Sequence, residues 1–374
     1  MPLRATAAVN LAAIERNVAT LRRRLTGGAE LCAVVKADAY GHGASQAAQA
    51  ALAGGATLLA VATADEAGEL RAAGIEAPLL VMGAVSLQEL EVALAVDAEL
   101  VAWAPAFIEA VRRATRSRPV RLHVKLDTGM GRLGTRDQHQ ALAVAEAVAA
   151  SSPQLELAGA MTHFATADDD PEFMERQLKA FEPFARELRR HWPQIALHAA
   201  NSAATLREPR SHLSLVRCGI AIYGCDPMHQ DPDRYELEPA FELRSYVAAV
   251  KPAQPGDSAG YGRRFISPGE TWIATLPIGY GDGIRRALTN NCDVLIGGRR
   301  YPLVGTVSMD NITVDLGPEP VVREGEPATI IGRDGAQRQT AEDLARRIDT
   351  INYEVLTGIS RRVPRVYHRD GEPA

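Results

Sequence analysis

Short apolar runs alternate with longer stretches rich in alanine and glutamate between residues 9 and 235. The short runs predict buried strands, and the longer stretches, with apolar positions every three or four residues, predict helices. This alternation is typical of repeated β-α units. Eight strands are predicted, at residues 31–35, 57–61, 78–82, 98–102, 120–126, 156–164, 195–200 and 214–217, and the helices between them include 44–52, 64–73, 86–95, 105–115, 138–149 and 171–192.

Eight parallel strands with crossover helices predict a (β/α)8 barrel of the TIM type, an α/β fold whose active sites lie at the carboxyl ends of the strands. An open doubly wound sheet is the alternative, because periodicity alone does not establish closure. We predict a barrel domain over residues 1–235, although the extreme N-terminus is free to pack with the second domain.

After about residue 236 helical stretches become scarce, and short strand-like runs are separated by Pro-Gly, Gly-Gly and Asp-Gly turns. This pattern predicts a mostly-β domain over residues 236–374. Its candidate strands are 241–250, 271–276, 294–296, 303–307, 312–314 and 328–331.

Composition narrows the class of protein. The 374 residues carry a net charge of -5, so nucleic acid is not an expected partner. No apolar stretch approaches the length of a membrane span, and the start of the chain lacks the apolar core of a signal peptide, so we expect a soluble, cytoplasmic protein without a membrane partner. The cysteines Cys32, Cys218, Cys225 and Cys292 form no C-x-x-C pair, which predicts buried thiols and neither a metal site nor a disulfide framework.

Lys36 ends the first predicted strand and is followed by Ala-Asp-Ala-Tyr40-Gly41-His-Gly43. An amine at the end of a buried strand loses water, which lowers its pKa and favours the neutral, nucleophilic form. Proteins hold the aldehyde of pyridoxal phosphate as a Schiff base with such a lysine. Tyr40 offers a phenol to a phosphate, and the two glycines let the backbone approach a ligand. A lysine that merely reaches solvent at a strand end is the alternative.

Polar residues gather where other predicted strands end. Strand alternation places His123, Lys125 and Asp127 on one face of the fifth strand, and polar groups inside a barrel are expected to be paired or functional. Phosphate sites in such barrels commonly follow strands seven and eight. There, Asn201 and Ser202 follow the seventh predicted strand and Gly219 and Ile220 follow the eighth.

Ser202 and the amides of Gly219 and Ile220 would supply neutral donors to a phosphate. Asn201-Ser202 also fits a helix N-cap, and the two interpretations are compatible, since helix N-termini bind anions.

Gly129-Met-Gly131-Arg-Leu-Gly134 matches the dinucleotide-binding pattern G-x-G-x-x-G. It lies in the fifth β-α unit, and no acidic residue ends a second strand about 20 residues further on, as that fingerprint requires. We therefore interpret it as a chance match, and a nicotinamide-dependent dehydrogenase is the least favoured function.

The segments together resemble alanine racemase, a family of fold-type III pyridoxal-phosphate enzymes. The resemblance covers residues 33 to 367 in the family's order. Its motifs are Ala33-Val-Val-Lys-Ala-Asp-Ala-Tyr-Gly-His-Gly43, Asp127-Thr-Gly-Met-Gly-Arg-Leu-Gly134, Thr162-His-Phe164, Asn201-Ser202, residues 217–224, Gly260-Tyr-Gly262, Gly279-Tyr-Gly-Asp-Gly283, Ser308-Met-Asp310 and Ile351-Asn-Tyr-Glu354.

The resemblance implies a pyridoxal 5'-phosphate enzyme built from a cofactor-binding barrel and a β domain, working as a head-to-tail homodimer whose sites are shared between subunits. Lys36 would carry the cofactor, and Arg217 would face its pyridine nitrogen, with His163 near the ring. Arg132 would hold the cofactor's phenolic oxygen beside the substrate, and the backbone amide of Met309 would hold the substrate carboxylate. The phosphate is assigned to Tyr40, Ser202, Gly219, Ile220 and Tyr353, next to Asn201, and Tyr280 and Asp310 would support the substrate region.

Racemisation removes a proton from one face of the α-carbon and returns one to the other, so two bases on opposite faces are the economical solution. The resemblance makes them Lys36 and Tyr261 of the partner subunit. A free tyrosine, with a pKa of about 10, is a poor base at neutral pH and needs help from nearby groups. A tyrosine that only fills a loop is the alternative. Arg217 stays protonated, so a pyridine nitrogen facing it must accept a hydrogen bond, which weakens the ring as an electron sink.

The resemblance further suggests that Lys125 is carbamylated and pairs with Arg132, whereas an ordinary Lys125–Asp127 surface pair is the competing interpretation. Cys218 stands where many members have proline, and Ser308 where some have cysteine; both touch the lining of the site.

The implied reaction is the interconversion of L- and D-alanine, which bacteria need for cell-wall peptidoglycan. A broad-specificity or serine racemase on the same scaffold is one alternative. A non-catalytic pyridoxal-phosphate-binding protein is another, although such a carrier has no use for a second base.

Overall fold

The computed structural model describes residues 3–115, 118–319 and 321–374, which form two compact units. One unit comprises residues 14–222 and 235–237, and the other comprises residues 3–13, 223–234 and 238–374. Within the described residues, no helix is both long and apolar enough to cross a membrane.

The first unit is built on an eight-stranded parallel sheet whose neighbours follow one another almost in chain order. The order is β8-β7-β6-β5-β4-β3-β2-β9. Between the two end strands, the Ser214 and Arg217 amides donate to the carbonyls of Leu197 and Ala200, both at 2.9 Å. These bonds bring the ends of the sheet together, so the predicted barrel is confirmed. The strands are β2 (Glu30–Val34), β3 (Leu58–Val61), β4 (Leu79–Val81), β5 (Glu99–Ala102), β6 (Val120–Lys125), β7 (Leu155–Met161), β8 (Ala196–His198) and β9 (Leu215–Cys218).

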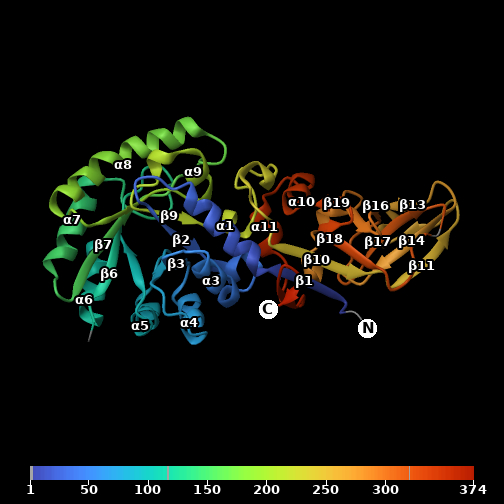
Figure 1. Ribbon diagram of the computed structural model, residues 1–374, viewed down its shortest axis with the longest axis horizontal. Helices are drawn as coiled ribbons and strands as arrows, with labels where there is room; N and C mark the ends of the chain where they lie inside the picture. Colours follow the sequence, from blue (N-terminus) through green and yellow to red (C-terminus); the bar gives the residue numbers. More distant parts are fainter. Residues whose placement is uncertain (1–2, 116–117, 320) are drawn as a thin grey trace. The chain divides into compact units, whose positions relative to one another are not determined.

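Helices lie outside the barrel strands (Figure 1). Their buried faces are rich in alanine and leucine, as in α4, where Ala64, Ala67 and Leu70 pack inward, and Thr63 and Glu66 form a capping box at its start. β3 and β4 are buried at every position, as expected for parallel strands covered on both faces. The helices are α1 (Leu11–Arg23), α3 (Ala44–Ala53), α4 (Ala64–Ala72), α5 (Leu87–Ala95), α6 (Pro105–Ala114), α7 (Gln138–Ala150), α8 (Pro171–His191) and α9 (Ser202–Arg207).

The second unit is built on a mostly antiparallel sheet of eleven strands. Its order is β11-β14-β17-β16-β15-β18-β10-β1-β20-β21, and β19 pairs with β18. The strands are β1 (Ala5–Asn10), β10 (Phe241–Tyr246), β11 (Ala249–Ala253), β14 (Thr271–Leu276), β15 (Asp293–Ile296), β16 (Arg299–Val304), β17 (Ile312–Gly317), β18 (Pro327–Asp334), β19 (Gln337–Gln339), β20 (Arg365–Arg369) and β21 (Glu372–Pro373), and a separate hairpin joins β12 (Ser258–Ala259) to β13 (Phe265–Ile266).

Several details of this unit differ from the sequence pattern. The single strand expected over residues 241–250 is two strands, because Val247 donates to Glu326 while Ala248 donates to Thr275, so the chain changes partner strands there. Two short helices, α10 (Ala341–Arg347) and α11 (Asn352–Thr357), were not predicted. Thr340 and Asp343 form a capping box at the start of α10, and the three-residue spacing between them is the sequence signal that could have predicted this helix.

Candidate active site

Lys36 lies at the carboxyl end of β2, two residues beyond the strand's last residue, and opens the segment α2 (Lys36–Gly41). The residues Ala37 to Tyr40 have φ between 51° and 55°, so the chain makes a left-handed turn of four residues that are not glycine. Two contacts hold this turn: the Ala37 amide donates to Glu66 Oε1 at 2.6 Å, and the Ala44 amide donates to Asp38 Oδ1 at 2.8 Å. The turn fixes the direction in which the chain leaves the lysine.

The environment of Lys36 favours its neutral amine. The side chain is half-buried. Burial lowers its pKa, and the positive charge of Arg132 lowers it further, against an opposing effect of Glu66. The arrangement therefore suits a lysine that acts as a nucleophile or a base.

Tyr40, Ser202 and Gly219 meet at the carboxyl ends of β2 and β9. Ser202 Oγ accepts hydrogen bonds from the amides of Gly219 at 3.0 Å and Ala221 at 3.4 Å, so its own hydroxyl hydrogen is available to another acceptor. Burial raises the pKa of Tyr40, which keeps the phenol protonated as a donor. Ile220 begins a 3₁₀ helix, where an amide has no acceptor within the helix. The donors are neutral and converge, as a phosphate site requires.

Asn201 caps α9, because its side chain accepts from the Ala204 amide at 3.0 Å. The N-cap interpretation of Asn201 therefore holds in the structure. Ser202, the first residue of the helix, has its hydroxyl turned to the β9 end of the barrel instead.

Arg217 is buried in β9 and held by four acceptors. Its Nη1 donates to His198 Nδ1 at 2.9 Å, while Nη2 donates to the Thr162 and Ala199 carbonyls at 2.8 and 2.9 Å and to His163 Nδ1 at 3.2 Å. Burial lowers the pKa of the guanidinium to about 10, which still leaves it protonated at neutral pH. Arg217 thus presents a fixed positive charge inside the barrel. The role of His198 in holding it was not foreseen from the sequence.

Lys125 and Asp127 are both buried, so the competing interpretation, an ordinary surface pair between them, is wrong. Burial, followed by the charges of Arg217 and Arg132, lowers the pKa of Lys125 to about 8. The Asp127 carboxylate instead accepts from the Gly129 and Gly131 amides, at 3.1 and 3.0 Å.

The same contacts show why the glycine-rich segment after β6 is not suited to bind a dinucleotide. Two of its amides are already bound by Asp127, and the next helix, α7, begins only at Gln138. A nucleotide diphosphate would need those amides. The structure therefore agrees with the interpretation of Gly129–Gly134 as a chance match.

A second set of candidate residues lies in the β unit. Tyr261 is 75% exposed, Met309 is 52% exposed and Tyr280 is also exposed. Hydrogen bonds join their loops: the Tyr280 amide donates to the Ser308 carbonyl at 2.9 Å, and Thr306 Oγ1 donates to the Tyr261 carbonyl at 2.6 Å. Asp310 pairs with Arg362 at 2.7 Å. These four predicted residues thus share one group of loops.

Tyr353 also belongs to the β unit, on α11, with its ring centroid 6.0 Å from that of His229. The adjacent Asn352 is buried and donates to Glu342 Oε1 and to the Asp226 carbonyl, both at 2.9 Å. These bonds anchor the start of α11 and fix where Tyr353 emerges.

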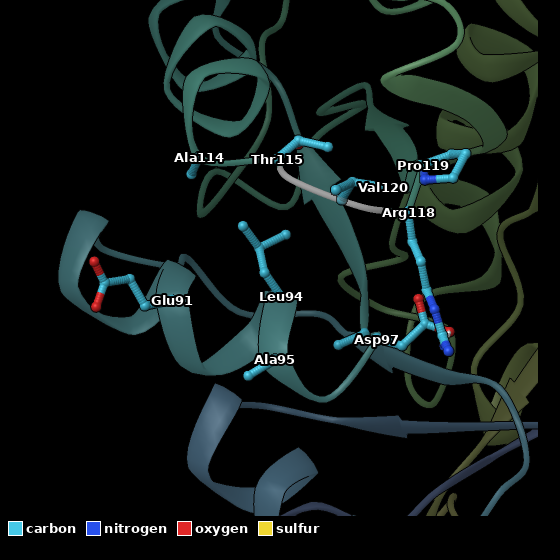
Figure 2. A pocket seen from close by; sticks show the side chains of 10 residues that line it. Glu91, Leu94, Ala95, Asp97, Ala114, Thr115, Arg118, Pro119 and Val120 are labelled. Atoms are coloured by element: carbon cyan, nitrogen blue, oxygen red, sulfur yellow. Dashed lines mark ion pairs between the residues drawn. The ribbon is translucent and has the colours of Figure 1, made fainter.

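Figure 2 shows a pocket of about 550 Å³ beside α5, away from these residues. It is lined by Leu94, Asp97 and Val120 among others, and Arg118 faces Asp97 at 3.7 Å. It lies toward the amino ends of the strands, the end opposite to Lys36. In barrel enzymes the residues at this end contribute to stability, and the active site lies at the other end. Among the described residues, no group of three or more His, Cys, Asp or Glu side chains could hold a metal ion, and all four cysteines are buried.

Two family models match the chain in the order of its two units. The alanine racemase N-terminal domain matches residues 9–227, and the alanine racemase C-terminal domain matches residues 240–367. Matches to both domains, in the order of the two units, identify the chain as an amino-acid racemase, which is an isomerase.

Relatives extend this match to nearly the whole chain. Curated alanine racemases from Geobacillus kaustophilus and Nostoc sp. are 42% and 40% identical, covering 97% of this chain and 94% and 95% of their own lengths. The crystal structure of alanine racemase from Streptomyces lavendulae has a TM-score of 0.93 at 37% identity, covering 98% of each chain. That of the Bacillus anthracis enzyme with bound L-Ala-P has a TM-score of 0.91 at 38% identity, covering 100% of this chain and 97% of that one. The chain belongs to the alanine racemase family.

Proposed function

We propose that the protein interconverts L- and D-alanine with pyridoxal 5'-phosphate held by Lys36. The observation that carries the proposal is the position of Lys36: a half-buried lysine with a lowered pKa at the carboxyl end of a barrel strand, at the end of the barrel that also bears Tyr40, Ser202 and Arg217. The full-length similarity to curated alanine racemases supports alanine as the substrate.

The residues present fit this cofactor. A β-carbon added at Gly219 would lie 2.4 Å from Tyr40 Oη, so the glycine leaves the phenol room beside the backbone. Ser202, Tyr40 and the Ile220 amide would hold the phosphate, and Tyr353 would join them. Arg217 would face the pyridine nitrogen, with His163 near the ring. When bound, pyridoxal phosphate supplies an electron sink that makes the substrate α-proton removable.

The chain's own residues would then move and hold protons. Lys36 Nζ takes the proton from one face of the α-carbon, and Tyr261 of the partner subunit acts on the other face. Burial lowers the pKa of Lys36, which favours the neutral amine that a base requires. The Met309 amide would hold the substrate carboxylate and Arg132 the cofactor's phenolic oxygen, while Tyr280 and Asp310 would support the substrate region.

The proposal requires a head-to-tail homodimer. Tyr261, Tyr280 and Met309 are exposed within a single chain and lie on one group of loops. A second copy of the chain, bringing its barrel to these loops, would give each site one base from each subunit. This arrangement also gives the β unit a function that a simple cofactor carrier lacks.

The testing experiment is α-proton exchange in D₂O with a panel of L-amino acids, followed by chiral analysis of the products. Alanine should exchange fastest and yield both enantiomers, and Lys36→Ala should abolish exchange and the visible absorbance of bound cofactor. If serine or a broad set of amino acids exchanges faster than alanine, the protein is a serine or broad-specificity racemase. If the cofactor is bound but no amino acid exchanges its α-proton, the protein is a non-catalytic pyridoxal-phosphate carrier.

A further inference from the structure

A chain of four buried polar side chains crosses the barrel interior from its amino end to its carboxyl end. Glu99, the first residue of β5, lies 2.7 Å from His123 Nε2 on β6. His123 Nδ1 lies 2.8 Å from His198 Nε2, and His198 Nδ1 lies 2.9 Å from Arg217 Nη1. Four different strands therefore contribute one group each, and the chain ends at the guanidinium assigned to the cofactor ring.

The chemistry of these groups fixes the direction of every hydrogen bond. A guanidinium only donates, so His198 Nδ1 must accept and its hydrogen must be on Nε2. His198 Nε2 then donates to His123 Nδ1, and His123 Nε2 donates to the Glu99 carboxylate. Burial, followed by the positive charge of Arg217, keeps the pKa of His198 well below its usual value, consistent with a neutral ring. Both imidazoles are thus neutral and carry their hydrogen on Nε2.

The chain also supplies a negative charge to a buried positive one. The four acceptors bound to Arg217 are two carbonyls and two imidazoles, all without charge. A buried charge is costly unless it is compensated. Glu99, whose side chain is 10% exposed and also pairs with Arg121 at 3.0 Å, provides that compensation through the two rings.

Two features show that the path is built into the barrel. The rings of His123 and His198 meet edge to face, with centroids 4.9 Å apart. A β-carbon added at Gly159 would lie 2.2 Å from His123 Nδ1, so the absence of a side chain there makes room for the imidazole. At the outer end, Glu99 and His123 line a cavity of about 580 Å³ at the amino ends of the strands.

We propose that Glu99 and His123 are positioning residues, which act through His198 to orient Arg217 and balance its charge from the opposite end of the barrel. They touch neither substrate nor cofactor. The effect of these residues on the cofactor ring rests on the proposed function. The direction of the hydrogen bonds does not, because it depends only on the protein's own side chains.

The first test is ¹⁵N NMR of the holoenzyme with labelled histidine, with His123→Gln and His198→Gln used to assign the two signals. Both rings should show the neutral pattern with hydrogen on Nε2. Hydrogen on Nδ1, or a doubly protonated ring, at either position would overturn the proposal. This result does not depend on which substrate the enzyme uses, so it separates a failure of this proposal from a failure of the proposed function.

The second test compares Glu99→Gln with Glu30→Gln in the holoenzyme. In Glu99→Gln the new side-chain amide would still accept from His123 but carries no charge, and Arg121 is exposed enough to turn away. Glu30 is an exposed carboxylate that begins β2 and lines the same cavity, which makes it a matched control. Glu99→Gln should lower kcat about tenfold with KM changed less than about twofold, and should shift the visible absorbance of bound cofactor. Glu30→Gln should do neither.

Gly159→Ala provides an independent perturbation, because it displaces His123 while leaving all four members of the chain intact. It should reproduce the fall in kcat and remove the Nε2–H signature of His123. If Glu99→Gln and Gly159→Ala both match Glu30→Gln in absorbance and kcat, Arg217 is held without the outer groups and the proposal is wrong.

Discussion

The phenol of Tyr40 packs directly against Gly219, where an added β-carbon would lie 2.4 Å from the phenolic oxygen. Gly219→Ala should therefore push Tyr40 out of the candidate phosphate site. We expect the dissociation constant for pyridoxal phosphate to rise about tenfold, which corresponds to loss of about one hydrogen bond. Gly269→Ala is the control, since nothing lies within 4 Å of the added carbon. Equal affinity of both variants, measured by titrating the apoenzyme, would argue against a phosphate at Tyr40.

Tyr261→Phe should keep the cofactor bound, because Tyr261 is an exposed residue of the β unit and the proposed anchor is Lys36. Loss of the phenol removes one base, so α-proton exchange should fall by about 10²-fold or more for one enantiomer and much less for the other. Exchange measured separately from L- and D-alanine checks this. Tyr367→Phe, on β20, serves as a control. Equal exchange from both enantiomers at the wild-type rate would remove Tyr261 from the mechanism.

Mixing two inactive variants tests whether sites are shared. In a head-to-tail dimer of Lys36→Ala with Tyr261→Phe, one site lacks both bases and the other has both. Random re-association at equal concentrations should therefore restore about a quarter of wild-type racemisation. If each site used both bases from one chain, the mixture would stay inactive.

Lys125 should react with carbon dioxide, since burial and its cationic neighbours lower its pKa to about 8 and so raise the neutral fraction near physiological pH. ¹³C-bicarbonate should give a carbamate signal in NMR of the wild-type protein. The signal should disappear in Lys125→Met and weaken in both bicarbonate-free buffer and acid, where the amine is protonated. A wild-type spectrum without the signal would show that Lys125 is an ordinary amine.

Asp127→Asn should destabilise the glycine-rich loop by about 1–2 kcal/mol at pH 7, because the carboxylate accepts two backbone amides and Arg136 at 3.2 Å. Although burial acts to raise it, these hydrogen bonds leave the pKa of Asp127 below its usual value. A lowered carboxyl pKa adds stability that is present above the unfolded-state value of about 3.9 and is lost as pH falls. Denaturant unfolding of both proteins should therefore converge in acid. A difference that persists unchanged at low pH would rule out the charge as its source.

The strands of the barrel were predictable because most of them are short, largely apolar runs, and β3, β4 and β5 are buried at every position. The N-terminal strand β1 was missed, since it pairs with β10 and β20, more than 200 residues away in the chain. Such partners leave no local mark on the sequence. The split between β10 and β11 was missed for the same reason.

The candidate site also contains residues that local sequence could predict and residues that it could not. Lys36 and the segment around it were found from local pattern and family resemblance. Alternation along β6 placed His123 on the inner face, but its partners come from β5 and β8. Only closure of the barrel brings Glu99, His198 and Arg217 onto one line, so no spacing along the chain could reveal it.

The left-handed turn after Lys36 restricts which residues can follow the lysine. Each L-residue in that conformation costs about 1–2 kcal/mol, and a branched β-carbon costs more. Ala37, Asp38, Ala39 and Tyr40 all lack that branch. The turn has the handedness that D-amino acids favour, so a semisynthetic protein with D-alanine at position 39 should be more stable than the natural chain, whereas valine there should not be tolerated.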